Sequence, residues 1–160
     1  RNTNKHPLIK DQFNLFRIGL IKKAIPLAKF VLVIRDFDDY FSSCIQKWFV
    51  ANDIYKHRSI ASHWITSNSV AYSDLHEYAI NDHAIINYNQ LLRNHQETQT
   101  LMDDVCDKLG LAQYNFNFGL INKRFRYSKN IKSSNSINFN LFPIDDILME
   151  YSKVKKQLTK

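Results

Sequence analysis

Two short, continuous apolar runs stand out in a chain whose other apolar residues are mostly spaced as on a helix. Residues 29–35 (KFVLVIR) follow Pro26 and end in charge, and residues 83–88 (HAIINY) form a second run of similar length. Short apolar runs rich in β-branched residues are typical of strands covered on both faces. Both runs are therefore predicted to be buried strands of a parallel sheet.

The segments around these runs carry apolar residues three and four positions apart, which predicts helices with one apolar face. The predicted helices span residues 11 to about 25, 39 to about 50, 59–78, 96–109 and 144 to about 158, after a polar loop over residues 1–10. Asp11 and Asp38 are the expected N-caps of the first two helices, and Gly110 is the glycine expected to close the fourth. Strands that alternate with helices in this order predict an α/β layered domain, with a parallel sheet flanked by helices.

The composition supports a folded domain without a membrane span. The 160 residues suit one domain, and 44% hydrophobic with 13% aromatic residues is enough to build a core. The longest apolar run, five residues at 30–34, is too short to cross a bilayer. Cys44 and Cys106 cannot form a zinc site or a disulfide framework by themselves, so both are expected to be buried free thiols. No metal is expected.

The charge points to an anionic partner without choosing it. Lys and Arg exceed Asp and Glu by 22 − 15 = +7, which suits nucleic acid, nucleotide phosphate, sulfated glycan or a membrane surface. A basic stretch with aromatic residues between the charges contains Lys123, Arg124, Phe125, Arg126, Tyr127, Lys129 and Lys132. Such a stretch suits RNA or DNA. However, the charge is spread over the chain and no nucleic-acid motif is visible, so a specific nucleic-acid partner is not expected. The three scattered glycines also exclude the phosphate loop of a P-loop kinase.

The clearest candidate chemistry lies after the first predicted strand. Arg35 stands at the carboxyl end of that strand, and Ser43 follows eight residues later, in the next predicted helix. Open α/β sheets bind ligands at this edge, and a guanidinium, a hydroxyl and a helix N-terminus together make a phosphate site. In the alternative interpretation, Arg35 pairs with Asp36 or Asp38 at the surface and Ser43 bonds a helix carbonyl. The spacing alone favours neither.

Four segments together resemble the sulfotransferase superfamily. Residues 29–43 (KFVLVIRDFDDYFSS) resemble its phosphate-binding segment, in which a strand ends in Arg-Asp-Pro and a Ser follows the Arg by eight. Residues 18–29 (IGLIKKAIPLAK) resemble the helix and Phe-Pro-x-Ala-Lys that lead into this strand. Residues 83–92 (HAIINYNQLL) resemble its strand and Tyr-Glu-Asp-Leu, and residues 102–111 (MDDVCDKLGL) its helix ending in Phe-Leu-Gly-Leu. The order and spacing match over residues 4–111.

The resemblance implies a P-loop-nucleotide-hydrolase-like layered fold and transfer of a sulfonate from 3′-phosphoadenosine 5′-phosphosulfate to a hydroxyl or amine acceptor. The acceptor, a protein tyrosine, glycan or small molecule, is not identified. By this resemblance Arg35 and Ser43 hold the 3′-phosphate, Tyr88 lies near the adenosine, and Lys123 and Arg124 belong to a segment that folds over the nucleotide. Without it, Tyr88 is equally well a tyrosine at the core edge, and the basic segment a solvated loop.

A further motif, Asn4-Lys5-His6-Pro7, is similar to one in tyrosylprotein sulfotransferases and in bacterial sulfotransferases fused to helical repeats. The similarity implies that Lys5 contacts the bridging oxygen or the sulfonate, where a cation stabilises the charge on the leaving phosphate oxygen. His6 is the alternative catalytic residue, because an imidazole can deprotonate an acceptor hydroxyl. A solvated loop is the other interpretation of both residues.

The chain departs from the family pattern in three places. Phe37 replaces the usual Pro, which is expected to leave the turn less rigid, and Asn89 replaces the usual Glu. The third departure is that no strand followed by a Gly-containing 5′-phosphosulfate loop precedes residue 29. We therefore expect residues 1–160 to be one partial sulfotransferase-like domain, with its core at 4–111, a basic segment and helix at 112–160, and no catalysis by itself.

Two expectations remain less specific. A non-catalytic basic module that binds nucleotide or nucleic acid is the alternative function. The chain begins with Arg and shows no leader, so its start is taken as cut from a longer protein whose targeting cannot be read. A cytoplasmic location is the resulting expectation.

Overall fold

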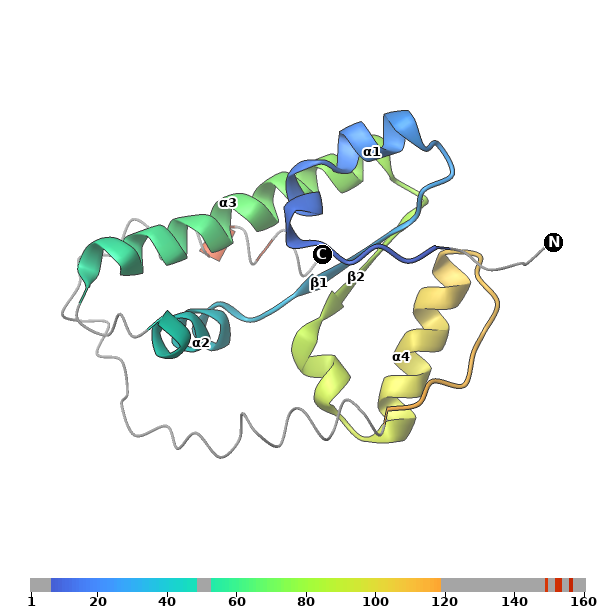
Figure 1. Cartoon of the computed structure of the whole chain (residues 1–160). Coiled ribbons are helices and arrows are strands. Elements are labelled where there is room, and N and C mark those ends of the chain that lie inside the picture. Colours follow the sequence, from blue (N-terminus) through green and yellow to red (C-terminus); the bar gives the residue numbers. More distant parts are fainter. Residues whose placement is uncertain (1–6, 49–52, 119–148, 150–151, 154–155, 157–160) are drawn as a thin grey trace.

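The two predicted strands pair in parallel at the centre of the structure (Figure 1). The computed structural model describes residues 7–48, 53–118, 149, 152–153 and 156. Strand β1 (Phe30–Ile34) lies beside β2 (His83–Asn87), in a register that runs from the pair Phe30 and His83 to the pair Ile34 and Asn87. The predicted strands and their parallel pairing are confirmed, in a mixed α/β structure with a small two-stranded sheet packed against helices.

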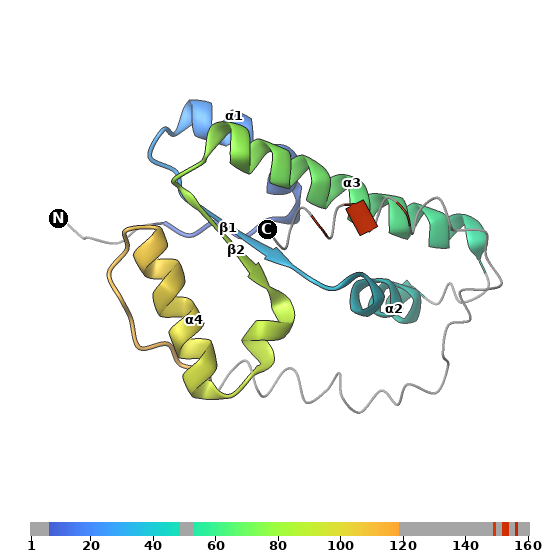
Figure 2. The same ribbon diagram turned by 180° about the vertical axis from the view of Figure 1, so that it is seen from behind.

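Helices lie on both sides of this strand pair. They are η1 (Gln12–Phe16), α1 (Ile18–Ala24), α2 (Phe37–Trp48), α3 (Ile54–Tyr78), η2 (Tyr88–Leu92) and α4 (His95–Lys108). The long α3 runs beside α1 on one side of the strands, and α4 lies on the other side (Figures 1 and 2). In the described part of the chain, no helix is both long enough and apolar enough to cross a membrane.

One face of the sheet forms the larger core. Leu32 and Ile34 of β1 point into it and are buried with Phe37 of α2 and Leu75 of α3. Phe37 and Leu75 are fully buried. Alternate residues of a strand point to opposite faces, so this cluster accounts for one half of the apolar run that the sequence shows.

The other face is covered unevenly. Ala84 and Ile86 of β2 are buried against Val105 of α4. Val31 and Val33, on the same face of β1, are 45% and 47% exposed. Among the described residues, therefore, β2 is covered on both faces as predicted, whereas β1 is covered on one.

The first predicted helix, over residues 11–25, is wrong as a single element. It is divided into η1 and α1 at Arg17, whose φ of −132° is not helical. A new helix begins at Ile18 because α1 packs against α3. The Gly19 amide donates to an Asp74 carboxylate oxygen at 3.3 Å. A Cβ at Gly19 would lie 2.8 Å from the Tyr78 ring, so glycine permits this close approach.

Helices α2 and α3 begin earlier than predicted. α3 starts at Ile54, because the Asp53 carboxylate accepts the Lys56 amide at 3.1 Å and caps it. In α2, the Asp36 carbonyl already accepts the Tyr40 amide at 2.9 Å. The predicted capping role of Asp38 is therefore wrong, since Asp38 lies in the first turn, where its charge still suits the helix dipole.

The other sequence expectations have mixed outcomes. Gly110 follows α4 with a φ of 59°, as predicted for a closing glycine. Both cysteines are free thiols, but only Cys106 is buried, and Cys44 is half-buried. The helix predicted over residues 144–158 lies mostly outside the described residues.

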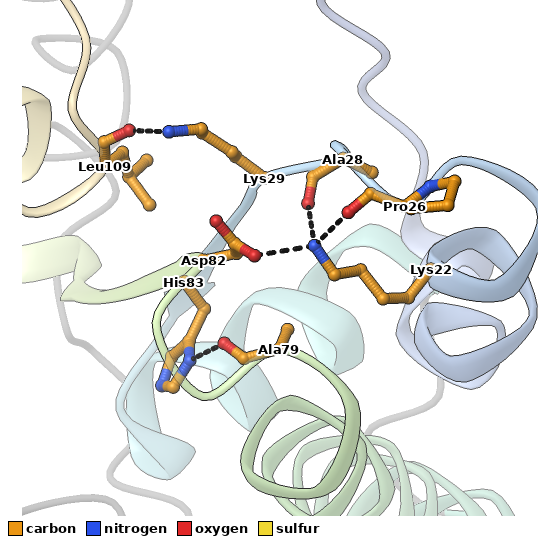
Figure 3. A network of polar contacts seen from close by, with 8 residues as sticks. All are labelled: Lys22, Pro26, Ala28, Lys29, Ala79, Asp82, His83 and Leu109. Carbon is orange, nitrogen blue, oxygen red and sulfur yellow. Dashed lines mark hydrogen bonds and ion pairs between the residues drawn. The ribbon is translucent and has the colours of Figure 1, made fainter.

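A lysine of α1 ties together the loops that enter the two strands (Figure 3). The Lys22 ammonium donates to Asp82 at 2.6 Å and to the carbonyl oxygens of Pro26 at 2.5 Å and Ala28 at 3.0 Å. These three bonds use all the donors of an ammonium group. They fix the α1–β1 loop against the α3–β2 loop at the amino end of the sheet.

Two further contacts of Figure 3 extend this arrangement. Lys29 donates to the carbonyl of Leu109 at the end of α4, which holds that helix to the start of β1. The buried His83 places its Nδ1 2.7 Å from the carbonyl oxygen of Ala79. Because a carbonyl can only accept, Nδ1 carries the proton in this contact. The start of β1 is thus tied to the end of α4, and the start of β2 to the end of α3.

The Lys22–Asp82 contact predicts an acid-sensitive contribution to stability. The hydrogen bond from Lys22, and then the charges of Lys22 and Lys29, hold the pKa of Asp82 below its ordinary value. The stabilisation is therefore present above the unfolded pKa, about 3.9, and is lost as the pH falls through the lower folded value. We expect Asp82→Asn to lower the melting temperature near neutral pH, and the gap from the unmodified chain to close as the pH falls through the lowered pKa of Asp82.

Thermal unfolding followed by circular dichroism over a pH series measures this gap. Asp104→Asn, which removes an exposed carboxylate from α4, is the matched control and is expected to leave the melting temperature nearly unchanged. A gap for Asp82→Asn that does not vary with pH would contradict this assignment.

Candidate functional site

The ends of the two strands bring two of the predicted site residues together. Arg35 directly follows β1, and Tyr88 directly follows β2 as the first residue of η2. The Arg35 guanidinium carbon lies over the Tyr88 ring, 5.3 Å from its centre, in a cation–π contact. Parallel strands end at the same edge, so the pairing of Ile34 with Asn87 makes this meeting possible.

The guanidinium of Arg35 has donors to spare. Its Nε is buried and has no hydrogen-bond partner, and no ion pair to Arg35 occurs among the described residues. The alternative interpretation, pairing with Asp36 or Asp38, is therefore not what the structure shows. A buried donor without a partner costs about 1–3 kcal/mol, and an anion bound at this edge would remove that cost.

The backbone at Arg35 is held by the core. The indole nitrogen of Trp64, in α3, donates to the Arg35 carbonyl at 3.0 Å. The Trp64 ring meets Phe37 edge to face at 5.7 Å, and Phe37 stacks on Phe41 at 5.4 Å. Phe37, which replaces the family's proline, thus anchors the turn after Arg35 through buried contacts.

Two asparagines bind the carboxylate next to Arg35. Asn87 donates to one oxygen of Asp36 at 3.0 Å, and Asn89 donates to the other at 2.6 Å. Asn89 also reaches Asp39 at 3.2 Å. From the sequence alone, Asn89 stands out only as a departure from the family pattern, and Asn87 does not stand out. The signal for Asn87 is local: an asparagine just before a turn commonly caps it, and the Asn87 side chain accepts the backbone amide of Asn89 at 2.8 Å.

Ser43 lies two turns into α2 and is half-buried. It follows Asp39 by four residues and so shares its helix face, which is the face that Asn89 of η2 contacts. In the part of the chain that the structure describes, its hydroxyl bonds neither a helix carbonyl nor Arg35. Ser43 is therefore on the side of α2 that faces η2, one turn beyond the Asp39 contact.

The surroundings of Tyr88 keep its phenol protonated. Burial raises its pKa above the ordinary value, the Asp39 charge adds to this rise, and the Arg35 charge opposes it. A phenol with a raised pKa stays a hydrogen-bond donor at neutral pH.

The remaining predicted site residues cannot be placed. Lys5, His6, Lys123 and Arg124 lie outside the described residues. Within the described ranges, no cluster of three or more His, Cys, Asp or Glu side chains is arranged to hold a metal ion. A cavity of about 490 Å³ lies beside η2 and α4, lined by Leu101 and by polar residues that include Arg93, but its lining contains none of the predicted site residues.

The profile of the sulfotransferase family matches residues 1–115. This match spans well over half of the 160 residues, so the chain belongs to the sulfotransferase family. Membership implies a transferase enzyme with a sulfonate acceptor. The comparison with curated proteins found no significant match, and neither did the comparison with solved structures.

The role of Phe37 can be tested by restoring the family's proline. Proline at the first position of a helix stabilises by less than about 1 kcal/mol, whereas loss of a buried phenylalanine ring costs about 3–5 kcal/mol. We therefore expect Phe37→Pro to reduce the free energy of unfolding by about 2–4 kcal/mol in urea titrations. Phe37→Leu, which keeps an apolar side chain, is the control and should lose less. A proline variant as stable as the unmodified chain would show that the ring does not anchor the turn.

Proposed function

We propose that this chain provides the donor-nucleotide site of a sulfotransferase that uses 3′-phosphoadenosine 5′-phosphosulfate and a hydroxyl or amine acceptor. The observation that carries the proposal is the guanidinium of Arg35, whose buried Nε has no partner among the described residues. It lies at the carboxyl end of a parallel strand, where open α/β sheets bind ligands. The family match, which includes this strand, supports the same assignment.

In the proposed site, Arg35 and Ser43 bind the 3′-phosphate of the donor. A guanidinium gives two parallel charge-assisted hydrogen bonds to phosphate, and a hydroxyl adds a third donor. The Tyr88 ring lies against the guanidinium, which limits its rotamers and leaves the phenol beside the nucleoside. Lys123 and Arg124 are proposed as further phosphate contacts, from the basic segment beyond the family match.

The proposed transfer breaks one bond and forms another. The acceptor oxygen or nitrogen attacks the sulfur, the sulfur–oxygen bond to the 5′-phosphate breaks, and adenosine 3′,5′-bisphosphate leaves. Negative charge grows on the leaving phosphate oxygen, where the ammonium of Lys5 would stabilise it. His6 would accept the proton that the acceptor loses. Both residues lie within the segment matched by the family.

Isothermal titration calorimetry with adenosine 3′,5′-bisphosphate tests the Arg35 assignment. A charge-assisted contact is worth about 1.5–3 kcal/mol, so Arg35→Ala should weaken binding about tenfold or more. Arg35→Lys should recover only part of this loss, because an ammonium lacks the planar fork. Adenosine 5′-monophosphate should bind less well, since it has no 3′-phosphate.

Arg93→Ala is the matched control, because Arg93 directly follows η2, is exposed and pairs with Glu97. It should keep the unmodified affinity. Equal affinity of Arg35→Ala and the unmodified chain would remove Arg35 from the site, and no binding by the unmodified chain would overturn the proposed function.

Catalysis is expected to fail even where binding succeeds. The sequence shows no Gly-containing loop for the 5′-phosphosulfate, and positioning of both donor ends supplies much of the rate of group transfer. We expect the 160-residue chain to give no turnover with labelled donor and a panel of phenol and sugar acceptors. Turnover that survives repurification and disappears in Lys5→Ala would contradict this expectation and favour a complete site.

A further inference from the structure

Arg35 is surrounded in sequence by acids that it does not bind. Asp36, Asp38 and Asp39 follow it within four residues, yet no ion pair to the guanidinium occurs among the described residues. A guanidinium and a nearby carboxylate attract each other strongly where water is partly excluded, so these acids compete for Arg35 unless other donors bind them.

The amides of Asn87 and Asn89 do this. Together they give each oxygen of Asp36 one hydrogen bond, at 3.0 and 2.6 Å. The Asn89 amide nitrogen has two hydrogens, and its second partner is Asp39 at 3.2 Å. Asn89 is itself held from behind, because its backbone amide donates to the Asn87 side chain at 2.8 Å.

These contacts cross the end of the sheet. Asp36 and Asp39 belong to the turn after β1 and the start of α2, and the asparagines to the end of β2 and to η2. The same bonds therefore link η2 to the start of α2, beside the contact in which the Tyr88 ring centre lies 5.3 Å from the guanidinium carbon of Arg35. An amide is neutral, so it satisfies the carboxylates without adding a cation that would compete for the phosphate.

We propose that Asn89 is a positioning residue that keeps the carboxylates of Asp36 and Asp39 from pairing with Arg35, so that the guanidinium is available to an anionic ligand. This inference rests on the proposed function for the identity of that ligand. When Asn89 is removed, Asp36 loses one of its two amide donors and turns to the arginine, which then meets the ligand already paired. An internal carboxylate thus competes with the phosphate.

The test is a double-mutant cycle on Asn89 and Asp36. Calorimetry with adenosine 3′,5′-bisphosphate is expected to show about tenfold weaker binding for Asn89→Ala. The reason is that Arg35 must give up one charge-assisted contact, to Asp36, before it binds the phosphate. Asp36→Asn alone should bind at least as well as the unmodified chain. The double variant Asn89→Ala/Asp36→Asn should recover the affinity to within about twofold, because no competing charge is left.

A merely structural role of Asn89 gives a different result. In that case Asp36→Asn removes further contacts and cannot restore binding, so failure of the double variant to recover affinity overturns the inference. Gln90→Ala is the matched control. The side-chain oxygen of Gln90 accepts the backbone amide of Asn87 at 3.1 Å, so Gln90 holds η2 without touching a carboxylate. Its effect on affinity should be small, and Asp36→Asn should not reverse it.

A second measurement separates this inference from the proposed function. The Arg35 charge lowers the pKa of Tyr88 and the Asp39 charge raises it, so this pKa reports on the charge around Arg35 without any ligand. This pKa can be measured by NMR titration of tyrosine labelled at the phenolic carbon, with Tyr88→Phe to assign the signal. The Tyr88 pKa should be higher in Asn89→Ala than in the unmodified chain, and lower in the double variant than in Asn89→Ala. If the unmodified chain binds no nucleotide, the proposed function fails. An unchanged Tyr88 pKa overturns the role of Asn89 independently.

Discussion

Parallel pairing of β1 with β2 is the interaction on which the candidate site depends. Parallel strands end at the same edge, so the register that places Ile34 beside Asn87 also places the next residues, Arg35 and Tyr88, together. The pairing is stabilised at its other end by Lys22, whose ammonium joins the two entering loops. Polar contacts at both ends of the sheet thus maintain the geometry at its carboxyl end.

Contacts with neighbouring side chains hold Arg35 in place and keep the nearest acid occupied. Its backbone is fixed by Trp64 and by the buried ring of Phe37, and its guanidinium lies against Tyr88. The neighbouring acids would neutralise it if they were unpartnered, but amides bind the nearest one. A partly buried cation that has no anionic partner among the described residues is costly in a folded chain unless a ligand supplies the anion, and such an arrangement is typical of a binding site.

The parts of the fold that were predicted correctly depend on local signals. The two strands were recognisable from short β-branched runs, and the end of α4 from Gly110, because both patterns act through the backbone of a few adjacent residues. The prediction of a single first helix was wrong because a tertiary contact, and no local signal, causes the break in it. Gly19 docks against Tyr78 of α3, a residue far away in the sequence, and no local pattern reports this contact.

The sequence by itself determined the family resemblance and the position of Arg35 at the end of a strand, since both follow from the order of residues in one short segment. It left open whether Arg35 pairs with Asp36. Only the tertiary structure decided this, because the partners of Asp36 are Asn87 and Asn89, separated from it by 51 and 53 residues. Attraction between adjacent charges can be anticipated from sequence, but competition from distant amides depends on which strand ends the fold brings together.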